Sequence, residues 1–195
     1  MKKEDIIKNE FINKSFGILE KVERLKMAAR PIYPYDMGII CALLDVKPGK
    51  KVLEAGTGSG GSALFFSHLG ADVTTYEINQ QFFKIAKENL KNTTIKCELG
   101  DVCKAKGKFD TIFLDLQHPA EYIKKLKKNL VEGGNFGVYT PIFDDIKPVW
   151  LELEKIGKPR AILLDSKEII VKKYARILGP LGFSGFFIWA QPTSV

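Results

Sequence analysis

Four acidic side chains in this sequence lie at or just after the end of a segment that is expected to form a β-strand. They are Glu54, Glu77, Asp101 and Asp115. In open parallel sheets, ligands bind beyond the carboxyl ends of the strands, so the four side chains are expected to share one site. A carboxylate in such a site can attract a cation, or accept hydrogen bonds from two adjacent hydroxyl groups.

A glycine-rich turn follows the first of these carboxylates and suggests which ligand is bound. Gly56-x-Gly58-x-x-Gly61 fits the dinucleotide fingerprint, whereas Glu54-x-Gly56-x-Gly58-x-Gly60 fits the pattern of S-adenosylmethionine (SAM) methyltransferases. Glu54 favours the second, because its carboxylate would repel a pyrophosphate but attract a sulfonium and an α-ammonium group. The glycines also let a ligand approach without meeting a Cβ. We therefore expect SAM as the cofactor; a tight turn without a ligand is the plain structural alternative.

An alternation of strands and helices would position these residues. It predicts a Rossmann-like class I SAM methyltransferase fold: a mostly parallel seven-stranded sheet with an antiparallel C-terminal hairpin and helices on both faces. Residues 1–30 are expected to form an N-terminal helical extension and residues 31–195 the methyltransferase domain. Strands are expected near 51–55, 72–77, 93–98, 109–115, 134–140, 160–171 and 181–190, and helices near 36–44 (capped by Asp36), 60–69, 79–91, 119–130 and 145–156.

The adenosine half of the cofactor has two candidate partners. Glu77 follows the glycine turn by about 20 residues, the spacing at which an acid binds ribose hydroxyls, and Asp101 is placed to accept a hydrogen bond from the exocyclic amine of adenine. A helix cap and a plain turn aspartate are the respective alternatives. The expected cofactor-binding residues are Glu54, Gly56, Thr57, Gly58, Ser59, Gly60, Glu77, Ile78, Asp101, Val102 and Asp115.

Asp115 is the expected catalytic or substrate-positioning residue. An apolar strand ends in this carboxylate, and a charge that closes a buried strand is costly unless something pairs with it. Asp110 opens the same strand and is therefore expected at the opposite edge, in a structural role. The helix expected at 36–44 must end near the start of the first strand. Its beginning, and Tyr33 just before it, are therefore expected at the carboxyl edge of the sheet, where the ligand binds.

Composition sets the broader limits. The formal charge of +7 and a pI near 9.2 suggest a polyanionic partner. Three scattered cysteines indicate reduced thiols and a cytoplasmic protein. With two histidines and no CxxC pair we expect no metal site, and no apolar segment is long enough to cross a membrane.

Chain direction separates the basic residues that are expected near the site from those expected away from it. Lys106, Lys108 and the lysines of the helix near 119–130 are expected on solvated faces away from the site. Lys172, Lys173 and Arg176 connect the last two strands on the working side, and Arg30 leads into the Tyr33 segment. These four are the candidate contacts for RNA phosphates.

Three blocks of sequence resemble the tRNA (adenine-N1) methyltransferases that modify the T-loop adenine. Residues 32–36 (Ile-Tyr-Pro-Tyr-Asp) resemble the family's Ile-Tyr-Pro-Lys-Asp, residues 52–60 match its SAM loop, and residues 114–119 resemble its Leu-Asp-x-Pro-acid-Pro-Trp motif. The resemblance implies SAM-dependent methylation of adenine 57 or 58 in tRNA, with Asp115 against the target base. Tyr33 is the candidate aromatic face for the extruded base, and a tyrosine that packs in the core is the alternative. The resemblance to this family also implies a homo-oligomer, either a dimer or a tetramer.

The sequence departs from that family at several positions. Tyr35 replaces the lysine, Gln117 and His118 replace the proline and the acid, and Ala120 replaces the tryptophan. The family's N-terminal β domain is not expected, because residues 1–29 are short and have helical spacing. These departures concern the choice of nucleotide more than SAM binding.

Alternatives remain open at this point. One is a SAM methyltransferase of the precorrin or isoaspartyl type, acting on a small molecule or a protein. Another is a catalytically silent, RNA-binding subunit of a two-chain tRNA methyltransferase. A nicotinamide dehydrogenase is disfavoured by Glu54 and by the final hairpin.

Overall fold

The computed structural model describes residues 17–166, 168–171, 175–178 and 184–191. Residues 1–16 of the expected N-terminal helical extension therefore lie outside the described residues. Across the described part of the chain, no helix is both long and apolar enough to span a membrane.

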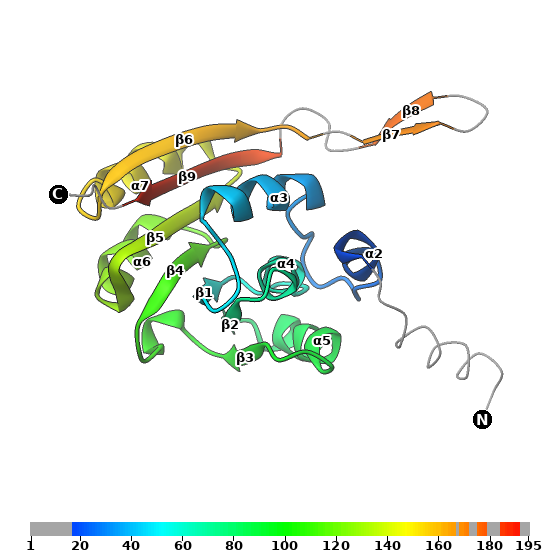
Figure 1. Ribbon diagram of the computed structural model, residues 1–195, viewed down its shortest axis with the longest axis horizontal. Helices are drawn as coiled ribbons and strands as arrows, with labels where there is room; N and C mark the ends of the chain where they lie inside the picture. Colours follow the sequence, from blue (N-terminus) through cyan, green and yellow to red (C-terminus); the bar gives the residue numbers. More distant parts are fainter. Residues whose placement is uncertain (1–16, 167, 172–174, 179–183, 192–195) are drawn as a thin grey trace.

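One seven-stranded sheet forms the centre of the molecule, in the order β3-β2-β1-β4-β5-β9-β6 (Figure 1). Strands β1 to β5 are parallel, and β9 runs antiparallel between β5 and β6. The predicted fold class is thereby confirmed. The strands are β1 Lys51–Ala55, β2 Asp72–Glu77, β3 Lys96–Leu99, β4 Phe109–Leu114, β5 Leu130–Thr140, β6 Lys158–Leu164 and β9 Gly185–Gln191.

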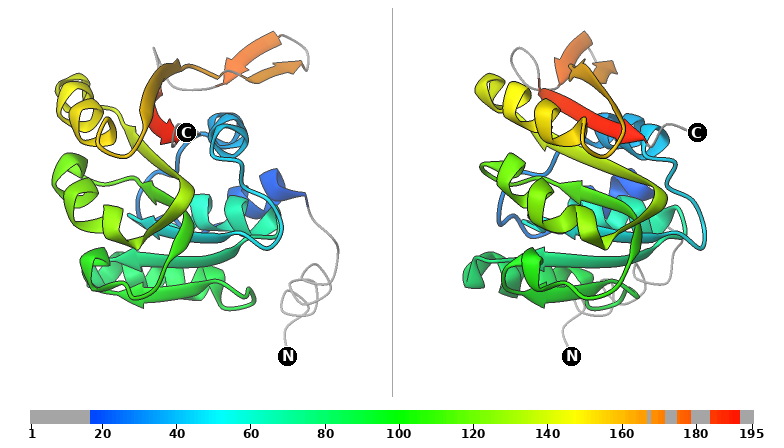
Figure 2. Two further views of the ribbon diagram at one scale, coloured as in Figure 1. Left: turned by 60° about the vertical axis from the view of Figure 1, so that its left-hand side comes forward. Right: turned by 90° about the vertical axis from the view of Figure 1, so that its left-hand side faces the viewer.

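Helices cover both faces of this sheet, which is why β1 and β4 are almost continuously buried (Figure 2). Side chains of α2 to α5 pack on one face, and those of α6 and α7 on the other. The helices are α2 Ile18–Glu23, α3 Pro34–Leu43, α4 Gly61–His68, α5 Gln80–Leu90, α6 Pro119–Leu126 and α7 Ile146–Leu153, with 3₁₀ turns η1 Val102–Lys104, η2 Lys127–Asn129 and η3 Phe143–Asp145.

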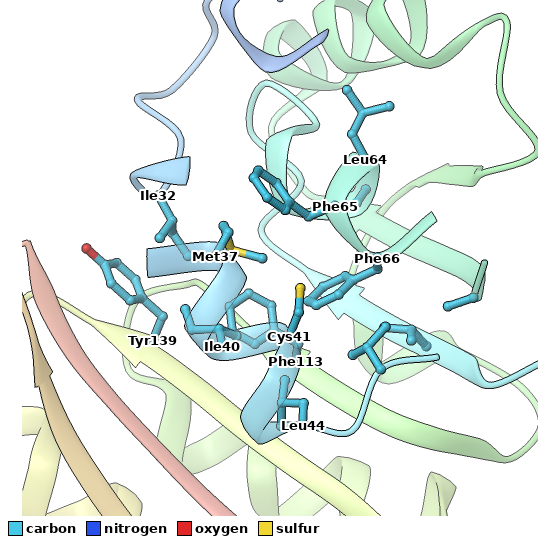
Figure 3. Close-up of a cluster of buried hydrophobic side chains, with 14 of the residues drawn as sticks. Ile32, Met37, Ile40, Cys41, Leu44, Leu64, Phe65, Phe66, Phe113 and Tyr139 are labelled. Atoms are coloured by element: carbon cyan, nitrogen blue, oxygen red, sulfur yellow. The ribbon is translucent and has the colours of Figure 1, made fainter. Parts of the chain in front are cut away.

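Helix α3 attaches to the sheet through one apolar stripe. Met37, Ile40, Cys41 and Leu44 are buried at the spacing of a single helical face. They meet Phe113 of the central strand β4 in the cluster drawn in Figure 3. This packing fixes the segment that leads into α3, and with it the position of Tyr33.

The start of α3 differs from the prediction that Asp36 caps the helix. The helix begins at Pro34, whose fixed φ suits the first helical position, and Tyr33 occupies the N-cap position without capping the helix through its side chain. Asp36 is fully buried, and its carboxylate accepts hydrogen bonds from Ser184 Oγ and from Ser166 N at 3.3 Å. Asp36 therefore joins α3 to the ends of β6 and β9.

The single long strand expected at 160–171 is wrong. Strand β6 ends at Leu164, and β7 Glu168–Val171 pairs with β8 Ala175–Leu178 in a separate two-stranded sheet. The interruption coincides with the bond from Ser166 N to Asp36, which takes the backbone out of the strand ladder. Strands β7 and β8 project beyond the main sheet (Figures 1 and 2).

The N-terminal extension packs on the domain where it is described. Val22 of α2 is buried in the same cluster as α3 and α4. The division into residues 1–30 and 31–195 stays a prediction.

Candidate active site

A cavity of about 670 Å³ opens at the carboxyl edge of the parallel strands. The glycine turn after β1 and the segments after β2, β3 and β4 form its wall, as chain direction predicts. Most of the expected cofactor-binding residues line it: Gly56, Thr57, Gly58, Ser59, Glu77, Ile78, Asp101, Val102 and Asp115. Glu54 and Gly60 are not among the lining residues.

Glu77 braces the glycine turn from the end of β2. Its Oε2 accepts a hydrogen bond from Gly58 N at 2.9 Å, and its Oε1 accepts one from Asn79 N at 2.9 Å. The side chain is buried while still lining the cavity. Glu77 does not cap α5: the N-cap is Asn79, whose side chain accepts hydrogen bonds from Gln81 N and Phe82 N.

Asp101 lines the same cavity. Its Oδ1 accepts a hydrogen bond from Cys103 N at 2.8 Å, so it starts the short turn η1, as the turn-aspartate alternative requires. Val102 beside it is buried, whereas Ile78, which also lines the cavity, is 71% exposed. An apolar side chain so exposed at a cavity wall suits a flat apolar group of a ligand.

Glu54 lies beneath the glycine turn rather than on the cavity wall. The side chain is fully buried, and neither carboxylate oxygen has a hydrogen-bond partner among the described residues. Burial raises the pKa of Glu54 to about 8; the charges of Asp115 and Glu77 add to this, and the nearby hydroxyls of Thr75 and Ser62 offset part of it. The hydroxyl of Thr75 also lies 2.6 Å from that of Thr57 in the glycine turn.

Asp115 stands where two cavities meet. A second cavity of about 250 Å³ is lined by Tyr33, Tyr139 and Ser184, among others. Arg30, Pro31 and Asp115 line both cavities. Asp115 is half-buried there, and burial raises the pKa of its carboxyl to about 7. The structure thus brings the expected pair, Asp115 and Tyr33, to one cavity.

Tyr139 lines the same cavity as Tyr33 and was not expected there. Its hydroxyl donates a hydrogen bond to Ser184 O at 2.5 Å, and burial, with the charges of Asp115 and Asp36, raises its pKa to about 12. Tyr139 lies near the carboxyl end of β5, just as Asp115 follows the carboxyl end of β4. The rule that ligands bind beyond the carboxyl ends of parallel strands, applied to β5, would have identified Tyr139 as a site residue. Ser184 carried no comparable signal, since only the fold brings it to Asp36.

The four expected RNA contacts are placed unequally. Arg30 is exposed and lines both cavities. Arg176 belongs to β8, and Lys172 and Lys173 lie outside the described residues. Lys108 lies at the opposite edge, where its Nζ donates to Lys128 O at 2.8 Å.

Asp110 takes the structural place expected of it. Its carboxylate accepts from Lys51 N at 2.8 Å and pairs with Lys50 Nζ at 3.1 Å, at the amino end of β4. These bonds lower the pKa of Asp110, whereas burial raises that of Asp115 at the other end of the same strand.

The donor set fits SAM, the cofactor that this fold implies. The acids on the cavity wall, Glu77, Asp101 and Asp115, suit a ligand with a cationic sulfonium and an ammonium group. Glu77, Ile78 and Asp101 all line the cavity, and they would hold the adenosine half. Bound there, SAM supplies an electrophilic methyl group.

The strand order and the position of the cavity are those of the class I SAM-dependent methyltransferase fold. A family model described as "tRNA methyltransferase complex GCD14 subunit" matches residues 23–177. The match spans most of the 195 residues, and the chain belongs to this family.

Curated relatives are similar over parts of the chain. The tRNA (adenine(58)-N(1))-methyltransferase TrmI of Thermus thermophilus is 33% identical over 116 residues, which are 54% of this chain and 46% of the relative. TrmI of Methanocaldococcus jannaschii, described as a tRNA (adenine(57)-N(1)/adenine(58)-N(1))-methyltransferase, is 26% identical over 70% of this chain and 61% of its own. A protein-L-isoaspartate O-methyltransferase of Pyrococcus horikoshii is 32% identical over 64% of this chain and 58% of its own. The chain thus spans about half to three-fifths of the length of these relatives.

Solved structures show the same fold. The tRNA (m1A58) methyltransferase TrmI of Aquifex aeolicus superimposes with a TM-score of 0.80 at 23% identity, covering 92% of this chain and 77% of that chain. A SAM-dependent O-methyltransferase of Thermotoga maritima gives 0.78 at 21% identity, covering 92% and 72%.

Proposed function

We propose that this protein is a SAM-dependent tRNA methyltransferase that methylates N1 of a T-loop adenine, of the adenine 57 or 58 type. The observation that carries the proposal is the junction of the two cavities at Asp115. A methyl donor in the larger cavity and a base in the smaller one would meet at this carboxyl group. Membership of the GCD14 family and similarity to the TrmI enzymes support adenine as the base.

Asp115 would orient the base and stabilise charge. The neutral N1 lone pair attacks the methyl carbon, the bond from carbon to sulfur breaks with its electrons remaining on sulfur, and the positive charge passes to the adenine. An ionised Asp115 accepts a hydrogen bond from the exocyclic amine, which holds N1 in line and stabilises the cationic product.

Tyr33 would receive the extruded base. A T-loop adenine is held in tertiary structure, so it has to leave its stack and find another aromatic face. Tyr33 lines the smaller cavity, and its ring lies 5.4 Å from that of Tyr35, between ring centroids. Arg30 at the junction, with Lys172, Lys173 and Arg176, would contact RNA phosphates.

The active form is proposed to be a homo-oligomer, a dimer or a tetramer. Among the strands that the structure describes, none pairs with the outer edge of β6, and Leu163 on β6 is 56% exposed. Such edges are commonly covered in native proteins. Light scattering of the purified protein tests this point, and a monomeric mass at assay concentration would contradict it.

A transfer assay tests the proposed reaction. The protein is incubated with methyl-labelled SAM and an unmodified tRNA transcript, and label in RNA is compared with label in an isoaspartyl peptide. We expect label in the tRNA, and none in a transcript in which the T-loop adenines are replaced by guanine. Similarity to isoaspartate methyltransferases makes the peptide the relevant competitor. Label in the peptide alone would favour that second function.

A further inference from the structure

Residues 25–31, which we call the strap, lie directly on the glycine turn of the cofactor cavity. A Cβ built on Gly58 would stand 3.3 Å from Cβ of Ala29, and one built on Gly61 would stand 2.9 Å from Cβ of Pro31. The contact is closer than most packing between side chains, so the strap and the turn leave no space between them. Ala29, Arg30 and Pro31 then form part of the cavity wall.

The strap belongs to no helix or strand, and two side chains outside it bond to its backbone. Asn89 of α5 accepts a hydrogen bond from Lys26 N at 3.0 Å through Oδ1, and donates through Nδ2 to Lys26 O at 2.9 Å. Ser59 of the glycine turn accepts from Ala28 N at 2.9 Å and donates to Ala29 O at 2.6 Å. Both polar backbone groups of Lys26 are therefore satisfied by one side chain.

Asn89 also reaches the glycine turn itself. Its Nδ2 donates a second hydrogen bond to Ser59 O, at 2.9 Å. One donor–acceptor amide thus joins α5, the strap and the turn. The partners fix its orientation, because the reversed amide would turn its oxygen toward two carbonyl groups and its nitrogen toward an N–H.

We propose that Asn89 is a positioning residue that clamps the strap over the glycine turn and so controls how tightly the cofactor is retained. Asn89 lines neither cavity, and acts through residues that do. The clamp itself is independent of the proposed function, on which only the identity of the retained ligand depends.

An isosteric substitution isolates the clamp. In Asn89→Asp the carboxylate still accepts from Lys26 N, but both donated bonds are lost and two carbonyl oxygens face a negative charge. Asn135→Asp is the matched control: Asn135 is also half-buried and donates Nδ2 to a backbone carbonyl, that of Leu44, at 2.9 Å. Asn135 lines neither cavity.

Two readouts are measured on the full chain. Trypsin cleavage after Lys26 in the protein without ligand reports whether the strap is held, and calorimetry with SAM reports its affinity. For Asn89→Asp we expect cleavage at least fivefold faster and SAM affinity about tenfold weaker, with KM for SAM raised and kcat at saturating SAM unchanged. Asn135→Asp is expected to match wild type in both. Ser59→Ala removes the bonds between its hydroxyl and the strap and should also speed cleavage; because Ser59 lines the cofactor cavity itself, the cleavage rate is the readout of the clamp in this variant.

Each outcome decides the proposal. Cleavage and affinity that stay at wild-type values in Asn89→Asp and Ser59→Ala would overturn it, and so would equal effects in Asn135→Asp. Faster cleavage with unchanged affinity would overturn the link to cofactor retention. A wild-type protein that does not bind SAM would contradict the proposed function, while the cleavage comparison still tests the clamp.

Discussion

The backbone carbonyl oxygen of Asp115 lies where a side chain on Gly56 would begin: a Cβ there would stand 1.8 Å from that oxygen. Asp115 N also donates to Ala55 O at 2.9 Å. The carboxylate and the first glycine are therefore held as one unit, at the ends of neighbouring strands. At this position the missing Cβ makes room for the protein's own backbone.

Replacing Gly56 by Ala tests this close approach. We expect loss of SAM binding and a free energy of unfolding lowered by well over the ~1–2 kcal/mol that a left-handed alanine alone costs, because the backbone of Asp115 has to move. Gly49→Ala is the control: Gly49 has φ +82° against +92° at Gly56, but no atom within 4 Å of its Cβ position. Thermal unfolding of both variants measures the difference, and equal losses would contradict a steric role for Gly56.

Replacing Asp115 by Asn should lower kcat for methyl transfer about 10²- to 10⁴-fold. The amide keeps the shape of the carboxylate, but it carries no charge to stabilise a cationic base. SAM affinity should fall much less than kcat. Asp110→Asn, at the other end of β4, should alter stability and leave kcat unchanged. Single-turnover transfer to tRNA separates these effects.

Proton release on cofactor binding should follow from the raised pKa of Asp115. With a pKa of about 7, this carboxyl group is partly protonated at neutral pH. A sulfonium in the same cavity favours the charged form, so SAM binding at pH 7 should release a fraction of a proton. S-Adenosylhomocysteine lacks the sulfonium charge and should release less. Binding enthalpies in buffers of different ionisation enthalpy measure the number, and equal release by both ligands would contradict the prediction.

Glu54 should make stability fall as pH rises. Burial raises its pKa from 4.5 to about 8, so between these values the folded state holds a proton that the unfolded state has lost. The contribution of Glu54 is complete below pH 4.5 and is lost on passing pH 8, with a slope of at most about 1.4 kcal/mol per pH unit. Glu54→Gln should therefore gain stability relative to wild type across this window. Urea unfolding at pH 5 and pH 8.5 measures the gain; a constant difference would argue against a protonated Glu54.

The aromatic ring of Tyr33, rather than its hydroxyl group, should contribute to the reaction with tRNA. Tyr33→Ala should lower kcat/KM for tRNA about 10- to 100-fold, the range of a lost base–aromatic stack, whereas Tyr33→Phe should stay near wild type. Tyr35→Ala is the neighbouring control, since Tyr35 is 38% exposed and lines neither cavity. A strong effect of Tyr33→Phe would instead point to its hydroxyl group.

Strand direction explains what was predictable in the site. Apolar strands that end in Glu77 and Asp115 revealed both the edge and its acids, because chain direction alone decides on which edge a residue lies. The same rule could not show that Glu54, which precedes the last residue of β1, is buried and does not line the cavity. Its placement depends on which face of the sheet each side chain takes.

Contacts between distant segments were beyond sequence reasoning. The bonds from Asn89 to Lys26 and from Asp36 to Ser184 join residues that share no motif and no periodicity. The break between β6 and β7 has the same origin, since Asp36 accepts a bond from Ser166 N. Such features follow from the assembled fold.

The most direct test of the account is the identity of the nucleoside that carries the methyl group. An unmodified tRNA transcript is treated with SAM and either wild-type protein or the Asp115→Ala variant, digested to nucleosides and fragments, and analysed by mass spectrometry. The account predicts 1-methyladenosine in the T-loop fragment with wild type, and its loss with Asp115→Ala, although that variant remains folded. Absence of methyladenosine with wild type, or near wild-type yield with Asp115→Ala, would contradict it.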